Sequence, residues 1–158
     1  MALVGKNFVF FHIPRTGGTW VRAALKLADP GTKRIGLQHC FPADPLLVPY
    51  VLDRTWFTVV REFESWYDSY KWMVRGHLGR DQAEVAANPM PVDGIYVHTA
   101  SLRKALPGIQ DRYTDQVDVI LHMENLMDEV AAFLNVLGYD GQGIVDKVGP
   151  EKKHERPR

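Results

Sequence analysis

Cysteine is nearly absent from this chain of 158 residues, and its single cysteine, Cys40, excludes an internal disulfide framework and a zinc site built on cysteines. The chain has no excess of either charge, because 19 lysine and arginine residues balance 19 aspartate and glutamate residues. A broad basic surface for nucleic acid or for an anionic membrane is therefore not expected. A local basic site remains possible and must be argued from the positions of individual residues.

Long apolar runs are also missing. No stretch approaches the roughly 20 residues that a membrane-spanning helix needs. Residues 1–14 contain one lysine and lead directly into an apolar segment, which matches a secretory signal peptide poorly. We expect a cytoplasmic protein without membrane or nucleic-acid partners. The sequence contains no internal repeat, no low-complexity segment and no signature of an oligomeric state.

The length of the chain suits one domain with a proper core, which we assign to residues 1–150. Residues 151–158 read EKKHERPR, and a charged tail of this kind that contains proline is expected to be flexible. Residues 41–50 hold three prolines, so this segment is expected to be irregular.

Apolar segments with two different periods alternate along the chain. Apolar runs rich in aromatic and β-branched residues predict core strands at Phe8–His12, Trp56–Val60 and Val117–Leu121. A short second strand is expected over Lys33–Gln38. Helical spacing predicts helices between Gly18 and Asp29, from Glu64 onward, over Ile95–Leu106, and over Glu124–Leu137 with Gly138 as its stop. This alternation predicts a P-loop-like α/β domain of three layers, with helices on both sides of a mainly parallel sheet. Ligands of such domains bind at the carboxyl edge of the sheet.

The turn between the first predicted strand and helix is made of groups that donate hydrogen bonds. Gly17 and Gly18 permit positive φ angles and allow a ligand to approach the backbone. Thr16 and Thr19 add hydroxyl groups, and Arg15 adds a fixed positive charge. With the amino-terminal end of a helix, these groups predict an anion site. A plain glycine turn capped by Thr19 is the alternative, and it leaves Arg15 and Thr16 without a role.

The neighbouring strand indicates which anion is bound. A P-loop nucleotidase has the pattern GxxxxGK[ST], but here no lysine precedes Thr19. Such enzymes also hold Mg²⁺ with an acidic residue at the end of a neighbouring strand. The strand Trp56–Val60 is followed instead by Arg61, which repels a metal ion and attracts a second anion. The sequence therefore favours a nucleotide with an extra phosphate over metal-bound ATP.

Three motifs resemble those of the sulfotransferases that use 3′-phosphoadenosine 5′-phosphosulfate (PAPS). HIPRTGGT resembles the HIPKTGGT-type loop for the 5′-phosphosulfate, and VVREFESWYDSYKW resembles the 3′-phosphate motif, with Ser69 eight residues after Arg61. VDVILHMENL is similar to a further, mostly structural block. The likeness covers residues 8–138 in pieces. It is nearest to the carbohydrate (Golgi-type) branch and its small bacterial or viral-type relatives.

The resemblance implies an activity and a set of binding residues. It implies in-line transfer of a sulfuryl group from PAPS to a hydroxyl or amine of a small-molecule or carbohydrate acceptor, with release of 3′-phosphoadenosine 5′-phosphate (PAP) and without a metal. The 5′-phosphosulfate would contact Arg15 and residues 16–19, and the 3′-phosphate would contact Arg61 and Ser69. Lys152 and Lys153 would close over the nucleotide, as a basic loop does in the family. Arg15 departs from the pattern, because the family usually has lysine there.

Aromatic residues and histidines supply the remaining candidates. The buried face of the first helix is predicted to consist of Trp20, Ala23, Ala24 and Leu27, and that of the helix after Glu64 of Trp66, Tyr70 and Met73. One ring of these helices is a candidate to stack on adenine, and Trp20 is kept among the cofactor-binding residues. His39 is our first choice of general base, since it follows the second predicted strand and should emerge beside the glycine turn. The alternative is a surface histidine.

Other histidines are expected to have structural roles. His12 is interpreted as a core or supporting residue beneath the turn, and His122 and Glu124 as groups that form a structural hydrogen bond or cap. The acceptor would contact the variable segments Phe41–Arg54 and Arg75–Tyr96. Two other functions remain open: a PAPS- or PAP-binding module with impaired catalysis, which Arg15 and the short chain favour, and an atypical P-loop nucleotide kinase.

Overall fold

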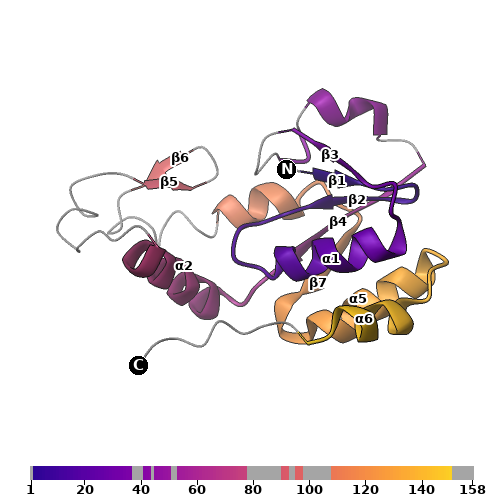
Figure 1. Ribbon diagram of the computed structural model, residues 1–158. Helices are drawn as coiled ribbons and strands as arrows, with labels where there is room; N and C mark the ends of the chain where they lie inside the picture. The colour runs from indigo at the N-terminus through magenta and orange to yellow at the C-terminus, as the bar shows by residue number, and fades with distance from the viewer. Residues whose placement is uncertain are drawn as a thin grey trace.

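The computed structural model describes residues 2–36, 41–43, 45–50, 53–77, 90–92, 95–97 and 108–150. It describes only the backbone of residues 48, 71–77, 90–92 and 95–97. These residues form an α/β domain whose open sheet has five strands in the order β3-β1-β2-β4-β7 (Figure 1). The strands of this sheet are β1 (Ala2–Val4), β2 (Phe8–Phe11), β3 (Lys33–Ile35), β4 (Thr55–Val60) and β7 (Val119–His122).

The helices are α1 (Gly18–Ala28), α2 (Phe63–His77), a helix over residues 108–114, α5 (Leu126–Val136) and α6 (Gly141–Val148). Short 3₁₀ turns cover Pro45–Tyr50 and Met123–Asn125, and a separate hairpin joins β5 (Met90–Val92) to β6 (Ile95–Val97). No helix in the described part of the chain has the length and apolar character required to cross a membrane.

The sheet is mixed because of its first strand. The predicted parallel pairing holds for β2, β4 and β7, but β1 is antiparallel to both β2 and β3. The sequence prediction missed β1, which has three residues and turns back at Gly5, whose N–H donates to the carbonyl of Phe8 at 2.9 Å. Strand β3 runs in the same direction as β2, so both strands end at one edge of the sheet.

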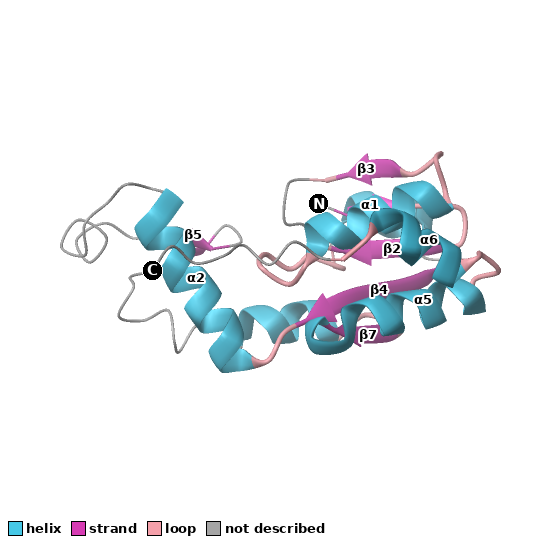
Figure 2. Ribbon diagram, turned by 60° about the horizontal axis from the view of Figure 1, so that its bottom comes forward, coloured by secondary structure: helices cyan, strands magenta, loops and turns pink. Residues whose placement is uncertain are grey.

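Successive residues of the central strands point to opposite faces of the sheet. Phe8, Phe10 and Phe57 pack against α1, α5 and α6 on one face, and the figures agree on this arrangement (Figures 1 and 2). Val9 and Phe11 belong to a second core cluster with residues of α2 and of the helix over 108–114. Both faces of β2 are thus covered, as its continuous apolar run predicted.

The buried face of α1 differs from the predicted one. Trp20 and Ala24 are buried as expected, but Ala23 is exposed and Leu27 is 50% exposed. Val21 and Leu25 are fully buried instead. Because this helix is apolar on more than one side, spacing alone could not fix its rotation about the axis. In α2, Trp66 and Tyr70 are buried as predicted, and the side chain of Met73 lies outside the description.

The predicted helix Ile95–Leu106 and the predicted strand Val117–Leu121 differ in part from the structure. Ile95–Leu106 does not begin as a helix, because Ile95–Val97 pairs with β5 as a strand, as its β-branched and aromatic residues permit. Residues 108–114 are helical, directly after the position where the prediction placed a helix end. Strand β7 begins at Val119 and pairs only with β4 in the described sheet, so Ile120 is 40% exposed at the edge.

Other boundaries agree more closely. Strand β4 and helix α5 were predicted, and Gly138, at φ +85°, ends α5 as expected, with the N–H of Tyr139 donating to the carbonyl of Leu134. Strand β3 stops at Ile35, three residues earlier than predicted. Helix α6 was missed, although Asp140 is its N-cap and accepts a hydrogen bond from the N–H of Gly143 at 3.0 Å.

Candidate anion-binding site

The turn between β2 and α1 lies at the carboxyl edge of the sheet. Arg15 and Gly17 both have left-handed backbone conformations, with φ of 67° and 75°. Helix α1 begins directly afterwards, and the carbonyl of Gly17 accepts hydrogen bonds from the N–H groups of Trp20 and Val21. The earlier N–H groups of this first turn, on Gly18 and Thr19, have no acceptor within the helix. They supply the positive end of the helix dipole at this edge.

Packing accounts for both glycines of the turn. A Cβ atom at Gly17 would lie 2.6 Å from Sδ of Met123, and the positive φ angle adds strain for any other residue. A Cβ atom at Gly18 would overlap the imidazole ring of His12. His12 is half-buried beneath the turn, which agrees with its predicted supporting role. The glycines therefore let the turn fit closely against its neighbours, whether or not a ligand is bound.

The two threonines of the turn have different environments. Thr16 is fully buried, and its hydroxyl donates to the carbonyl of Ile13 at 2.8 Å. That hydroxyl holds the turn together, so only the backbone N–H of Thr16 is left to bind an anion. Thr19 is exposed, and its hydroxyl accepts a 3.3 Å hydrogen bond from Nη2 of Arg22.

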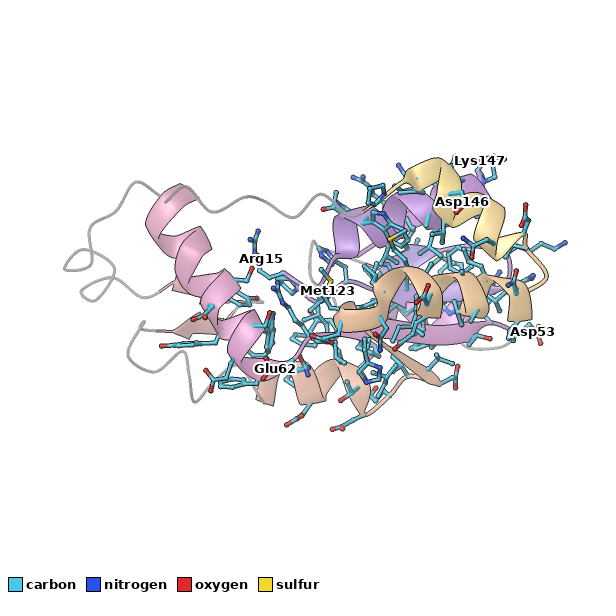
Figure 3. The ribbon with its side chains drawn as sticks, turned by 90° about the horizontal axis from the view of Figure 1, so that it is seen from below. Arg15, Asp53, Glu62, Met123, Asp146 and Lys147 are labelled. Atoms are coloured by element: carbon cyan, nitrogen blue, oxygen red, sulfur yellow. The ribbon has the colours of Figure 1, made fainter. Side chains whose placement is uncertain are left out.

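Two arginine–serine pairs connect this turn to α2. Nε of Arg15 donates to Oγ of Ser69 at 3.0 Å, and Nε of Arg61 donates to Oγ of Ser65 at 2.8 Å. Nη1 of Arg61 also donates to the carbonyl oxygen of Arg15 at 3.2 Å. Figure 3 shows the Arg15 side chain between the turn and α2. The structure thus brings together three of the predicted residues, Arg15, Arg61 and Ser69.

The guanidinium groups of the two arginines repel each other. The pKa of Arg15 lies below its ordinary value, first because the side chain is partly buried and second because Arg61 is nearby. Both effects disfavour the charged form of Arg15. An anion placed between the two guanidinium groups would offset both costs. Ser69, at 8% exposure, adds a buried hydroxyl to the same cluster.

Helix α2 is fixed in position by contacts at its first turn. Nε1 of Trp66 donates to the carbonyl of Pro14 at 2.8 Å, which joins the helix to the turn between β2 and α1. The carboxylate of Glu62 accepts hydrogen bonds from the N–H groups of Ser65 and Glu64, and these bonds lower its pKa. The N–H of Glu62 in turn donates to Oε1 of Glu124 at 2.8 Å. Glu124 therefore has the structural role that the sequence suggested.

The remaining candidates lie apart from this cluster or outside the description. Trp20 is 7% exposed in the core, and its Nε1 donates to the carbonyl of Gly149 at 2.7 Å, so little of its ring is open to adenine. His122 is exposed at the end of β7, where Nδ1 lies 3.3 Å from Oε2 of Glu129. His39, Lys152 and Lys153 lie outside the described residues.

Ser65 is the member of the cluster that sequence reasoning missed. It lies four residues after Arg61 and four before Ser69, so Ser65 and Ser69 share one face of α2. This spacing was a usable signal. The motif of the resemblance specifies one serine eight residues after the arginine and does not include Ser65.

Within the described residues, no group of three or more His, Cys, Asp or Glu side chains is arranged to hold a metal ion. Comparison of the chain with protein-family models, curated proteins and solved structures finds no match. The function of the site must therefore be inferred from its own residues and their geometry.

Replacing Gly18 with alanine is expected to lower the free energy of unfolding by about 1–3 kcal/mol, because the added methyl group overlaps the His12 ring. In a His12→Ala background the same change should be close to neutral, since the obstacle is gone and alanine favours a helix. Urea unfolding of the four proteins measures both values. An equal cost in both backgrounds would contradict the packing of His12 against the turn.

Proposed function

We propose that the chain is a PAPS-dependent sulfotransferase. The observation that carries this proposal is the cluster of Arg15, Arg61 and Ser69, in which residues from two motifs far apart in the sequence meet beside the first turn of α1. The resemblance assigns the motif with Arg15 to the 5′-phosphosulfate and the motif with Arg61 and Ser69 to the 3′-phosphate. We also propose that the domain is of the P-loop-like, three-layer kind, which the helices packed on both faces of the sheet support.

The chemistry of the donors fits a nucleotide with two separate phosphate positions. The turn offers backbone N–H groups, and the cluster offers two guanidinium groups and two serine hydroxyls. The cluster is positive where a Mg²⁺-dependent nucleotidase would have a carboxylate at the end of the neighbouring strand. PAPS, when bound, supplies the sulfuryl group that is transferred to the acceptor.

The roles of the residues follow from charge and position. The N–H groups of Gly18 and Thr19 and the guanidinium of Arg15 bind the 5′-phosphate and stabilise negative charge on the leaving oxygen. Arg61 and Ser69 bind the 3′-phosphate and so fix the position of the nucleotide. Unlike the usual lysine, Arg15 spreads its charge over a planar guanidinium group. This group reaches Ser69 of α2, while the Arg15 backbone belongs to the turn.

His39 is the proposed general base that removes the proton of the acceptor. Strand β3 ends at the same edge of the sheet as β2, as the proposal requires, and His39 follows four residues after Ile35. We expect His39→Ala to abolish sulfuryl transfer and to leave PAP affinity unchanged, because a base contacts the acceptor and not the nucleotide. Transfer of label from PAPS and calorimetry with PAP measure the two properties. Retained turnover would assign the base to another residue.

Ligand-induced stabilisation separates the possible functions. PAP at 100 times its dissociation constant should raise the free energy of unfolding by about 2.7 kcal/mol, whereas ATP with Mg²⁺ should have a much smaller effect. Thermal unfolding with each ligand provides the measurement. Stabilisation by ATP with Mg²⁺ alone would contradict the proposal and favour a kinase. Stabilisation by PAP without any transfer from PAPS to a panel of acceptors would identify a binding module instead.

A further inference from the structure

Ser65 has a hydroxyl group with a hydrogen still to donate. Its Oγ accepts the hydrogen bond from Nε of Arg61 and makes no other side-chain hydrogen bond to the described residues. A serine within a helix often donates to the carbonyl four residues earlier, which here is that of Arg61, but no such bond is present. Because a hydroxyl both accepts and donates, the Ser65 hydrogen remains available to a ligand.

Arg61 and Ser69 also have hydrogens that they donate to no described residue. Arg61 uses Nε for Ser65 and Nη1 for the carbonyl of Arg15, and Nη2 makes no hydrogen bond to a described residue. The Ser69 hydroxyl accepts from Arg15 and, like that of Ser65, donates to no other described residue. Ser65 and Ser69 are one helical turn apart, a rise of about 6 Å. Three donors that no described residue uses, one on Arg61 just before α2 and one on each of the two serines of α2, therefore lie near the start of this helix.

These donors match the terminal oxygens of a phosphate monoester. Such a group carries about two negative charges near neutral pH and has three strong acceptor oxygens. Arg61 lies beside a second guanidinium, that of Arg15, so the position favours a dianion over a single charge. Ser65 is partly buried, and a hydrogen bond from it to a charged oxygen would be partly shielded from water.

We propose that Ser65 is a direct ligand of the nucleotide's 3′-phosphate, together with Arg61 and Ser69. This assignment rests on the proposed function, because it takes the 3′-phosphate to bind at this cluster. Ser65 thereby helps the site to prefer a nucleotide with a 3′-phosphate over one with a 3′-hydroxyl. The sequence resemblance assigned this role to Arg61 and Ser69 only.

Calorimetric titration of the full chain with PAP and with adenosine 5′-phosphate, at one salt concentration, tests the assignment. Ser65→Ala should weaken PAP binding by about 10-fold or more, and adenosine 5′-phosphate binding by less than about 2-fold, because only PAP reaches Ser65. Ser65→Cys, nearly the same size with a weak donor, should change affinity in the same direction. Gln142→Ala, which removes an exposed side chain from α6, is the matched control and should alter neither affinity.

A purely structural role for Ser65 predicts a different result. If Ser65 only orients Arg61, then Ser65→Ala should weaken PAP binding in the wild-type background and have no effect in an Arg61→Lys background. The assignment predicts that the loss persists in both backgrounds, and its absence in the second would overturn it. Alanine is a good helix former, so the variant should fold, which circular dichroism verifies.

The experiment separates this inference from the proposed function. Wild-type protein that binds PAP no better than adenosine 5′-phosphate would refute the 3′-phosphate site and the sulfotransferase proposal with it. Wild-type protein that prefers PAP, combined with unchanged PAP affinity in Ser65→Ala and Ser65→Cys, would overturn only the assignment of Ser65.

Discussion

The hydrogen bond from the Arg61 guanidinium to the backbone carbonyl of Arg15 joins two arginines at the carboxyl edge of the sheet. Partial burial of Arg15 disfavours its charge, and the like charge of Arg61 nearby adds to this effect. The surrounding fold imposes the arrangement, since Arg61 follows the central strand β4 and Arg15 belongs to a turn whose backbone is fixed by Thr16 and by packing at Gly17. Under the proposed function, this arrangement is already in place before the nucleotide binds.

The serines near the start of α2 orient the two arginine side chains, because each serine accepts a hydrogen bond from one arginine. Trp66 joins the helix to Pro14, and Glu62 caps its first turn while being bound in turn by Glu124. With the helix fixed, its serines lie where each arginine can donate to one of them. Because each hydroxyl accepts a hydrogen bond from an arginine, its own hydrogen can be donated to another group, which makes the cluster rich in donors. Such a composition suits phosphate groups and opposes a metal-bound triphosphate.

Local sequence signals predicted the parts of the fold that depend on local structure. The apolar run of β2, the turn with Arg15, and the helix α5 ended by Gly138 each have a strong pattern over a few residues. Strand β1 has only three residues, and it is stabilised by pairing with β2 and β3, which no local sequence pattern reveals. The exposure of Ile120 likewise depends on where β7 lies in the sheet.

The candidate site was predictable as a set of residues and not as a set of contacts. The sequence indicated Arg15, Arg61 and Ser69, but the bond between Arg15 and Ser69 joins residues that are 54 positions apart and requires the folded chain. The hydroxyl of Thr16 appeared free in the sequence, yet the turn uses it internally. Ser65 was overlooked because its role depends on the geometry of one helical turn.

The most direct measurement of the central claim compares Arg61→Ala with the wild type by calorimetry, using PAP and adenosine 5′-phosphate. If the cluster at α2 binds a 3′-phosphate, the substitution should weaken PAP binding by about 100-fold and adenosine 5′-phosphate binding much less, as expected for loss of a partly buried charge-assisted contact. Equal losses for the two nucleotides, or no loss for either, would contradict this account.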